Sequence, residues 1–343
     1  MIRKPVTRRD FVKLSAGSTA ALGMLMFDMP EFDRLFAAAL NEVPVIWMQG
    51  GSDSGCTESL VNVVGPSIYD VLLGPIGDKH LSMQFHQTIM AGQGDQAMDA
   101  LYNTAAKPGY VLVMEGAIAE KDNGVYATVG EQNGVGISAL KHLLDLAPSA
   151  SVVIALGACC TGGGIPAAPP NVTGVKAVSQ ILEENSITTP VVNIPGCPPH
   201  PDWMVGSLAQ ILIGGLDSVE LDSQKRPTAF FSATIHDHCE RRGSFEAENF
   251  AKKLGEDGCL YKLGCKGPQT HADCPTRLWN NKTSWCVATN SPCIGCAAIE
   301  FPFELQSTYE GIPLMTLEDK IAIGVAGGVV LAGGAALAKK AFS

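Results

Sequence analysis

Three cysteines of this 343-residue chain occupy equivalent positions, because each follows a short apolar run that is typical of a buried strand. They are Cys56, Cys159 and Cys197, and glycine stands directly before two of them, at Gly55 and Gly196. The carboxyl ends of parallel strands meet at one edge of an open sheet, where ligands bind. Glycine lets the backbone approach closely and offer its amides to sulfur. The positions therefore predict one site on which three thiols converge, although any one of them alone could be an inert buried cysteine.

The last third of the chain carries two further groups of possible ligands. One group is His236, Cys239, Cys259 and Cys265, and the other is Cys274, Cys286, Cys293 and Cys296. Four such side chains would also suit zinc. Irregular loop spacing is more typical of iron–sulfur clusters than of zinc modules, which favour two paired knuckles. We predict iron–sulfur sites, with zinc as the alternative. Segment 157–164 is glycine-rich but lacks the Gly-Lys-Ser/Thr ending of a phosphate loop.

Composition excludes several classes of protein. With 46% hydrophobic and 17% charged residues, the chain is not intrinsically disordered. A formal net charge of −10 argues against a nucleic-acid surface. Eleven cysteines in so long a chain are too few, and odd in number, for a disulfide scaffold. Metal or redox chemistry is the remaining explanation for them.

The elements that would hold the first site alternate between strand and helix. Apolar runs rich in Val and Ile predict strands at Val43–Met48, Tyr110–Gly116, Ser151–Gly157 and Pro190–Pro195. Helices are predicted at Leu81–Asn103, Ile137–Leu146, Val175–Asn185 and Asp202–Ile213. Such alternation indicates an α/β domain, a doubly wound parallel sheet covered by helices. After about residue 225 periodicity fades, and we expect a segment that folds around inorganic ligands with little core of its own.

Both ends of the chain carry targeting patterns. Arg8, Arg9 and Phe11 are followed by a weakly apolar stretch and a small-residue cleavage site at residues 37–39, which predicts a twin-arginine export signal over residues 1–39 rather than a plain basic helix. Near the other end, residues 321–338 are uncharged. Eighteen helical residues span about 27 Å, just enough for a bilayer core. Two lysines follow, so we predict a membrane anchor over residues 313–343 with a cytoplasmic C-terminus; a buried helix or a glycine-alanine tail is the alternative.

Several motifs together resemble the small subunit of nickel–iron hydrogenases, of the exported, membrane-bound uptake type. The most specific is Cys259-Leu260-Tyr261-Lys262-Leu263-Gly264-Cys265-Lys266-Gly267-Pro268. The others are Trp47-x2-Gly50 with Gly55-Cys56-Thr57-Glu58-Ser59, Gly157-Ala158-Cys159, Pro195-Gly196-Cys197-Pro198-Pro199-His200-Pro201, His236-x2-Cys239, Asp273-Cys274-Pro275 and Pro292-Cys293-Ile294-Gly295-Cys296. The resemblance covers nearly the whole chain, including its two ends.

The resemblance implies a flavodoxin-like domain over residues 40–225, an irregular cluster domain over residues 226–312, and three iron–sulfur clusters in a row. Cys56, Cys159 and Cys197 match the proximal cluster, a 4Fe–4S cluster nearest the nickel–iron centre that a large partner subunit holds. Cys274, Cys293 and Cys296 match the medial cluster. His236, Cys239, Cys259 and Cys265 match the distal 4Fe–4S cluster. The implied function is to relay electrons from dihydrogen, oxidised in the large subunit, to a membrane cytochrome b on the outer or periplasmic face of the membrane.

Two departures from the family pattern concern the ligand sets. Asp53 stands where the family usually has the first proximal cysteine, and Cys286 stands where many members have proline in the medial motif. If both are ligands, each cluster has four, and the medial cluster can be 4Fe–4S rather than 3Fe–4S. Cys160 is then left over. It is not expected to replace the missing thiolate, because adjacent residues of an extended segment point to opposite sides. The extra cysteines of some oxygen-tolerant members are absent at Gly55 and Gly164.

Two rival functions are compatible with parts of this pattern. The chain could be an iron–sulfur protein of another respiratory complex, although the medial and distal motifs speak against it, or a hydrogen-sensing protein, although the export signal speaks against that. No nickel site is evident, so no activity is expected from the chain alone. Glu58 and Glu115 are candidates for a subunit interface, a proton path or a structural role. Six histidines stay unassigned: His80, His86, His142, His200, His238 and His271.

Overall fold

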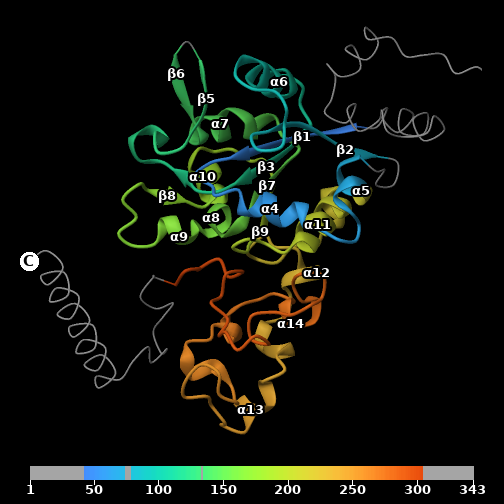
Figure 1. Cartoon of the computed structure of the whole chain (residues 1–343). Helices are drawn as coiled ribbons and strands as arrows, with labels where there is room; N and C mark the ends of the chain where they lie inside the picture. Colours follow the sequence, from blue (N-terminus) through green and yellow to red (C-terminus); the bar gives the residue numbers. More distant parts are fainter. Residues whose placement is uncertain (1–41, 74–78, 133, 304–343) are drawn as a thin grey trace, which may run out of the picture.

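The computed structural model describes residues 42–73, 79–132 and 134–303, and Figure 1 shows an α/β body with a less regular part beside it. The body is built on five parallel strands in the order β2-β1-β3-β7-β9. Counted along the chain, that order is 2-1-3-4-5, which is the flavodoxin-like arrangement. The strands are β1 (Glu42–Gln49), β2 (His80–His86), β3 (Val111–Glu115), β7 (Val152–Leu156) and β9 (Val191–Ile194). The doubly wound parallel sheet predicted from the sequence is therefore confirmed.

Helices cover both faces of the sheet, and each face has its own apolar core. One core joins Val45 and Trp47 of β1 to Leu60 and Trp203, and the other joins Ile46 of the same strand to helices on the opposite face. The first face is covered by α4 (Gly55–Val61), α5 (Ile68–Leu73) and α11 (Pro201–Gly214). The second is covered by α6 (Asp95–Ala105), α7 (Ala139–Leu146) and α10 (Val178–Glu184). Alternate side chains of a buried strand thus serve both cores.

Smaller elements complete the body. Two antiparallel pairs are β4 (Ile118–Ala119) with β8 (Val175–Lys176) and β5 (Thr128–Gln132) with β6 (Val135–Ser138). Two short helices, α8 (Gly157–Gly162) and α9 (Gly164–Ala167), follow β7. Single 3₁₀ turns are η3 (Lys121–Gly124), η4 (Ala147–Ser149) and η5 (Leu216–Ser218).

The irregular part contains only short helical pieces within the described residues. They are α12 (Thr228–Phe231), η6 (Ile235–His238), α13 (Arg242–Glu246), η7 (Leu260–Leu263), η8 (Gly267–Gln269) and α14 (Cys274–Arg277). Its buried Phe231, Leu260 and Trp285 belong to the same apolar core as β1 and α11. The segment therefore shares the core of the sheet, which agrees with the expectation that it builds little core of its own.

Three predicted helices start later than the sequence pattern indicated. The one expected over Val175–Asn185 begins at Val178, after strand β8. The helix expected over Leu81–Asn103 is wrong in its first half, where the chain forms β2 and then a turn, and α6 begins at Asp95. The alternation Leu81, Met83, Phe85 has the two-residue period of a strand, which pairs in parallel with β1. The helix expected from Ile137 begins at Ala139, because Ser138 caps it by accepting a hydrogen bond from the Lys141 amide.

The predicted export signal and the membrane anchor lie outside the described residues. Within residues 42–73, 79–132 and 134–303, no helix combines the length and the apolar character needed to cross a bilayer.

Candidate metal sites

The sheet brings the proximal group together, which we define as Asp53, Cys56, Cys159 and Cys197. Cys56 lies in the first turn of α4 after β1, Cys159 lies in α8 after β7, and Cys197 follows β9. All three thiols therefore stand at the carboxyl end of the sheet, as the sequence predicted. Burial raises the pKa of Cys56, and the nearby charges of Glu115, Cys159 and Cys197 raise it further. Burial followed by Cys197 raises the pKa of Cys159 to about 11.

Asp53 adjoins this group but makes a local bond as well. Its side chain is exposed, and Oδ1 accepts a hydrogen bond of 2.9 Å from the Gly55 amide. Such a bond two residues ahead is typical of an Asx turn. Its charge nevertheless raises the pKa of Cys56, Cys159 and Cys197, so the carboxylate lies close to all three sulfurs.

A buried hydrogen-bond network lies behind the proximal group, centred on Glu115. Glu115 is fully buried, and its Oε2 accepts hydrogen bonds from Trp47 Nε1 at 2.7 Å and Thr57 Oγ1 at 2.5 Å. Its Oε1 accepts from Ser52 Oγ at 3.0 Å and from the Thr57 amide at 3.3 Å. His86 Nε2 contacts Thr57 Oγ1 at 3.2 Å. Because Thr57 directly follows Cys56, this network holds the loop that carries the thiol. Of the roles considered for Glu115, its described environment fits the structural one.

The distal group consists of His236, Cys239, Cys259 and Cys265, and all four line one small pocket. Arg241 also lines it, and its backbone amide donates to Cys239 Sγ at 3.4 Å. Burial raises the pKa of both Cys239 and Cys265. The His236 ring is held against the edge of Phe245, with the ring centres 4.6 Å apart. The residues grouped by sequence spacing thus face a common space.

The medial group consists of Cys274, Cys286, Cys293 and Cys296. Burial raises the pKa of Cys274, and the charges of Cys296 and Cys286 add to the effect. Burial likewise raises the pKa of Cys296 to about 11, and Cys286 contributes there too. The Gly295 amide donates to Cys293 Sγ at 3.4 Å. Cys286 is exposed, but it lies close to two sulfurs of this group.

Electrostatic neighbours link the three groups in a series. Cys197 of the proximal group acts on the pKa of Cys296 of the medial group. Cys265 of the distal group raises the pKa of Cys293, after the larger effect of burial. Two hydrogen bonds join the same segments: the Lys266 amide, beside Cys265, donates to the Cys293 carbonyl at 2.7 Å, and Trp203, near Cys197, donates to Asp273, beside Cys274, at 2.7 Å.

The donor sets fit iron–sulfur clusters. A thiol becomes a metal ligand as thiolate, and here burial and neighbouring sulfurs oppose ionisation. A cationic iron core would offset both effects, and backbone amides aimed at sulfur are a usual feature of such sites. No three histidine, cysteine or carboxylate side chains in the part of the chain that the structure describes converge tightly enough for a single metal ion.

Cys160 is turned away from the proximal group. It is fully buried and donates its S–H to the Gly116 carbonyl at 2.9 Å. The expectation that it does not supply a ligand agrees with this contact. The alternation of an extended segment is not the reason, however, because Cys159 and Cys160 lie in helix α8.

Comparison with known proteins gives consistent results for both parts of the chain. A family model described as NADH ubiquinone oxidoreductase, 20 Kd subunit, matches residues 54–211. A second model, which describes the C-terminal part of the NiFe/NiFeSe hydrogenase small subunit, matches residues 231–309. Together with the fold and the cysteine groups, these matches define the chain as an iron–sulfur-containing oxidoreductase subunit.

Close relatives identify the family. The periplasmic [NiFeSe] hydrogenase small subunit of Desulfomicrobium baculatum is 40% identical over 309 residues, which cover 87% of this chain and 96% of the relative. The quinone-reactive Ni/Fe-hydrogenase small chain of Wolinella succinogenes is 35% identical over 356 residues and covers 96% of each chain. The solved [NiFeSe] hydrogenase structure from Dm. baculatum superposes with a TM-score of 0.73 at 39% identity, over 78% of this chain and 99% of that one. The chain belongs to the nickel–iron hydrogenase small-subunit family, and it is the small subunit of a heterodimeric hydrogenase.

Proposed function

We propose that this protein holds three iron–sulfur clusters, one in each of the proximal, medial and distal groups, and relays electrons from the large subunit to a membrane acceptor. The clusters would supply one-electron redox chemistry. The proximal ligands would be Asp53, Cys56, Cys159 and Cys197; the medial ligands Cys274, Cys286, Cys293 and Cys296; and the distal ligands His236, Cys239, Cys259 and Cys265.

The series of three groups is the observation that carries this proposal. Each group contains at least three thiols, and hydrogen bonds join Lys266, beside Cys265, to Cys293, and Trp203, near Cys197, to Asp273 beside Cys274. A neutral imidazole at the distal group replaces a charged thiolate, which tends to raise the potential of a cluster held there. Electrons would then move away from the large subunit.

Export and membrane attachment form the second part of the proposal. Residues 1–39 would direct folded protein through the twin-arginine route, and residues 313–343 would anchor it on the outer face of the membrane. A membrane cytochrome b is the partner that would accept the electrons. The quinone-reactive name of the Wolinella relative supports an acceptor of that kind.

We further propose that the chain has two domains. A flavodoxin-like domain over residues 40–225 would hold the proximal group, and a cluster domain over residues 226–312 would hold the other two groups. The two family models match on either side of residue 225. The rival interpretation, a protein of another respiratory complex, draws on the model that matches residues 54–211, but the hydrogenase model covers both remaining groups.

Metal analysis of the complex tests the proposal. The chain should copurify from membranes with a nickel-containing large subunit, and the iron content should match three clusters plus the nickel–iron centre. A double variant, His236→Ala with Cys259→Ala, should lose one cluster's iron and keep the nickel. Unchanged iron in that variant, or a wild-type complex without iron beyond the large subunit, would refute the assignment. Cys160→Ala is the matched control, because Cys160 lies outside all three groups.

A further inference from the structure

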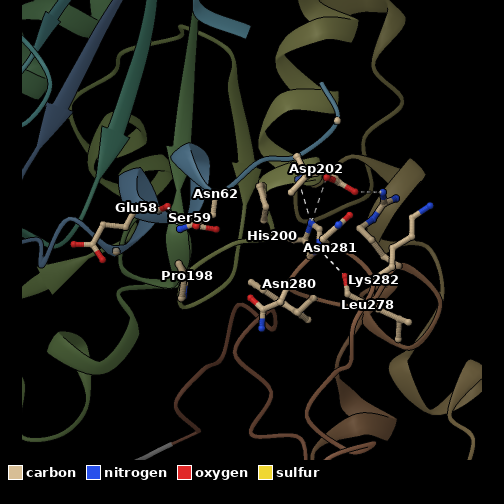
Figure 2. Close-up of a pocket in the computed structure, with 16 residues that line it drawn as sticks. Glu58, Ser59, Asn62, Pro198, His200, Asp202, Leu278, Asn280, Asn281 and Lys282 are labelled. Atoms are coloured by element: carbon tan, nitrogen blue, oxygen red, sulfur yellow. Dashed lines mark hydrogen bonds and ion pairs between the residues drawn. The ribbon is translucent and has the colours of Figure 1, made fainter. Parts of the chain in front are cut away.

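The beginning of helix α11 joins the proximal group to the medial group. The helix starts at Pro201, three residues after the Cys197-Pro198 pair, and its first turn meets the segment that carries Cys274. Figure 2 shows this junction, with His200 and Asp202 on one side and Leu278 on the other, beside a pocket formed where the two parts of the chain meet.

His200 makes the first of these contacts. It is 5% exposed, and its Nδ1 accepts a hydrogen bond of 3.1 Å from the Asp202 amide. The other ring nitrogen, Nε2, lies 2.8 Å from the Leu278 carbonyl oxygen. Because Nδ1 is an acceptor, Nε2 carries the proton and donates it to that carbonyl. Burial lowers the pKa of His200, so the ring is neutral and its tautomer is set by these two bonds.

Trp203 and Asp202 make the second contact, with the short helix α14. The Trp203 indole is fully buried and donates from Nε1 to Asp273 Oδ1 at 2.7 Å. Arg277 donates to Asp202 Oδ2 at 3.0 Å and through Nε and Nη2 to Asp273. A guanidinium that joins two carboxylates has a fixed geometry. Asp273 directly precedes Cys274, so α11 is tied to the backbone beside a medial thiol.

Aromatic rings pack in the junction, and the junction extends to the helix that carries Cys56 of the proximal group. Ring centres of His200 and Trp279 are 4.8 Å apart, and those of Trp203 and Phe231 are 5.0 Å apart. On the proximal side, buried Ser59 of α4 donates from Oγ to the Pro199 carbonyl at 2.7 Å. Helix α4 also carries Cys56, so the segments of two proximal thiols, Cys56 and Cys197, are joined to the same junction.

We propose that His200, Asp202 and Trp203 are positioning residues that fix the separation between the proximal and medial groups. This rests on the proposed function, because the separation matters only if both groups hold clusters. Electron tunnelling weakens exponentially with distance, so a small shift of α14 relative to Cys197 changes the rate between the two sites. The three residues are members of neither group and act through Leu278, Asp273 and Arg277.

The test uses the intact complex with its large subunit. His200→Ala removes the bond to the Leu278 carbonyl, and His200→Gln restores a donor at a similar reach. We expect His200→Ala to keep full iron content, to alter the magnetic interaction between the reduced proximal and medial clusters, and to slow hydrogen-dependent reduction of an acceptor several-fold. His200→Gln should return both quantities toward the wild type. Asp202→Asn, which weakens the bond to Arg277, should change the same magnetic interaction. If His200→Ala loses iron, the magnetic interaction in Asp202→Asn tests the positioning role in its place.

Ser207→Ala is the matched control. Ser207 is buried in the same helix, but its Oγ donates to the Trp203 carbonyl within α11, at 2.6 Å. That variant should keep the wild-type magnetic interaction. An unchanged interaction in both His200→Ala and Asp202→Asn, with iron in place, overturns the positioning role. Absence of clusters from the wild-type complex would instead overturn the proposed function.

Discussion

Several thiols of the three groups are held where ionisation is unfavourable without a cation. Burial is the largest cause of the raised pKa at Cys56, Cys159 and Cys274, and neighbouring sulfurs add to it. If iron binds at these thiols, as proposed, its binding should release protons. Two predictions concern Asp53 beside the proximal thiols and Cys286 beside the medial ones.

Substitution of Asp53 tests whether this residue is a cluster ligand or only a residue of the turn. We expect Asp53→Ala to lose or degrade the proximal cluster, and Asp53→Cys to keep it with a shifted potential, because a carboxylate is a harder donor than thiolate. Asp53→Asn is the control, since it can still accept the hydrogen bond from the Gly55 amide but lacks the charge. Iron analysis and cluster spectra measure the outcome. Full iron and unchanged spectra in Asp53→Asn and Asp53→Ala would show that Asp53 is a turn residue.

We expect Cys286 to decide which type of cluster the medial group holds. With four thiolates the medial site can hold a 4Fe–4S cluster, whereas three suit a 3Fe–4S one. The oxidised wild-type complex should therefore lack the strong electron paramagnetic resonance signal of a 3Fe–4S cluster, and Cys286→Ser should gain or strengthen it. A strong signal in freshly prepared wild-type complex would make Cys286 a spectator.

Gly157 leaves room for the Cys56 sulfur. Its φ is +86°, and a Cβ at this position would lie 2.7 Å from Cys56 Sγ. Gly157→Ala should therefore displace the sulfur and lower proximal iron occupancy, as well as cost about 1–2 kcal/mol for the left-handed backbone. Gly255→Ala is the control, because its φ is +88° but nothing lies within 4 Å of the added Cβ. Equal iron content in the two variants would contradict this role.

At the scale of elements, the end of strand β2 supports the residues behind the proximal group. It is the edge strand next to β1, and His86 at its end contacts Thr57 behind the proximal group. His86 Nδ1 accepts from the Thr88 amide at 3.1 Å, so the neutral ring fits its surroundings and a protonated ring does not. Burial lowers its pKa to about 4.

The lowered pKa of His86 predicts acid sensitivity. The unfolded chain binds a proton near pH 6.5 and the folded chain only near pH 4, so stability is present above pH 6.5 and falls as pH decreases toward 4. His86 should account for a loss of about 2 kcal/mol between pH 7 and pH 5. Urea unfolding of the complex at both pH values, with His86→Gln as the comparison, measures it. The same acid loss in His86→Gln as in the wild type would exclude His86 as the cause.

At the scale of the whole molecule, one core connects the sheet with the cluster-bearing part. Trp47 of β1, Trp203 of α11 and Leu260 beside the distal group belong to it. Figure 1 shows the irregular part, which begins with α12, extending from the side of the body that carries α11. A shared core resists relative motion of the two parts. If the three groups hold clusters, as proposed, this core would keep their spacing fixed.

Export is the prediction that concerns the whole chain. If the paired arginines form a twin-arginine signal, replacing both Arg8 and Arg9 by Lys should leave the protein unprocessed in the cytoplasm, while the wild type starts near Leu40 and fractionates with the membrane. Fractionation with N-terminal sequencing of the mature protein measures both. Normal maturation of the double variant would refute the export proposal.

The sequence alone determined the features that depend on local pattern. Runs of Val and Ile between glycine and proline predict β1, β3, β7 and β9, because a buried parallel strand must be apolar on both faces. The positions of Cys56, Cys159 and Cys197 after such runs predict their convergence, because parallel strands end at one edge of the sheet.

Only the tertiary structure decided which distant residues support the sulfurs. Glu115 and Trp47 are 68 residues apart, His200 and Leu278 are 78 apart, and Ser59 and Pro199 are 140 apart. Such hydrogen bonds leave no periodic pattern in the sequence, because they depend on how separate elements pack. The alternation at β2 was present in the sequence, but a short edge strand and the start of a helix compete for such a run until pairing with β1 decides between them.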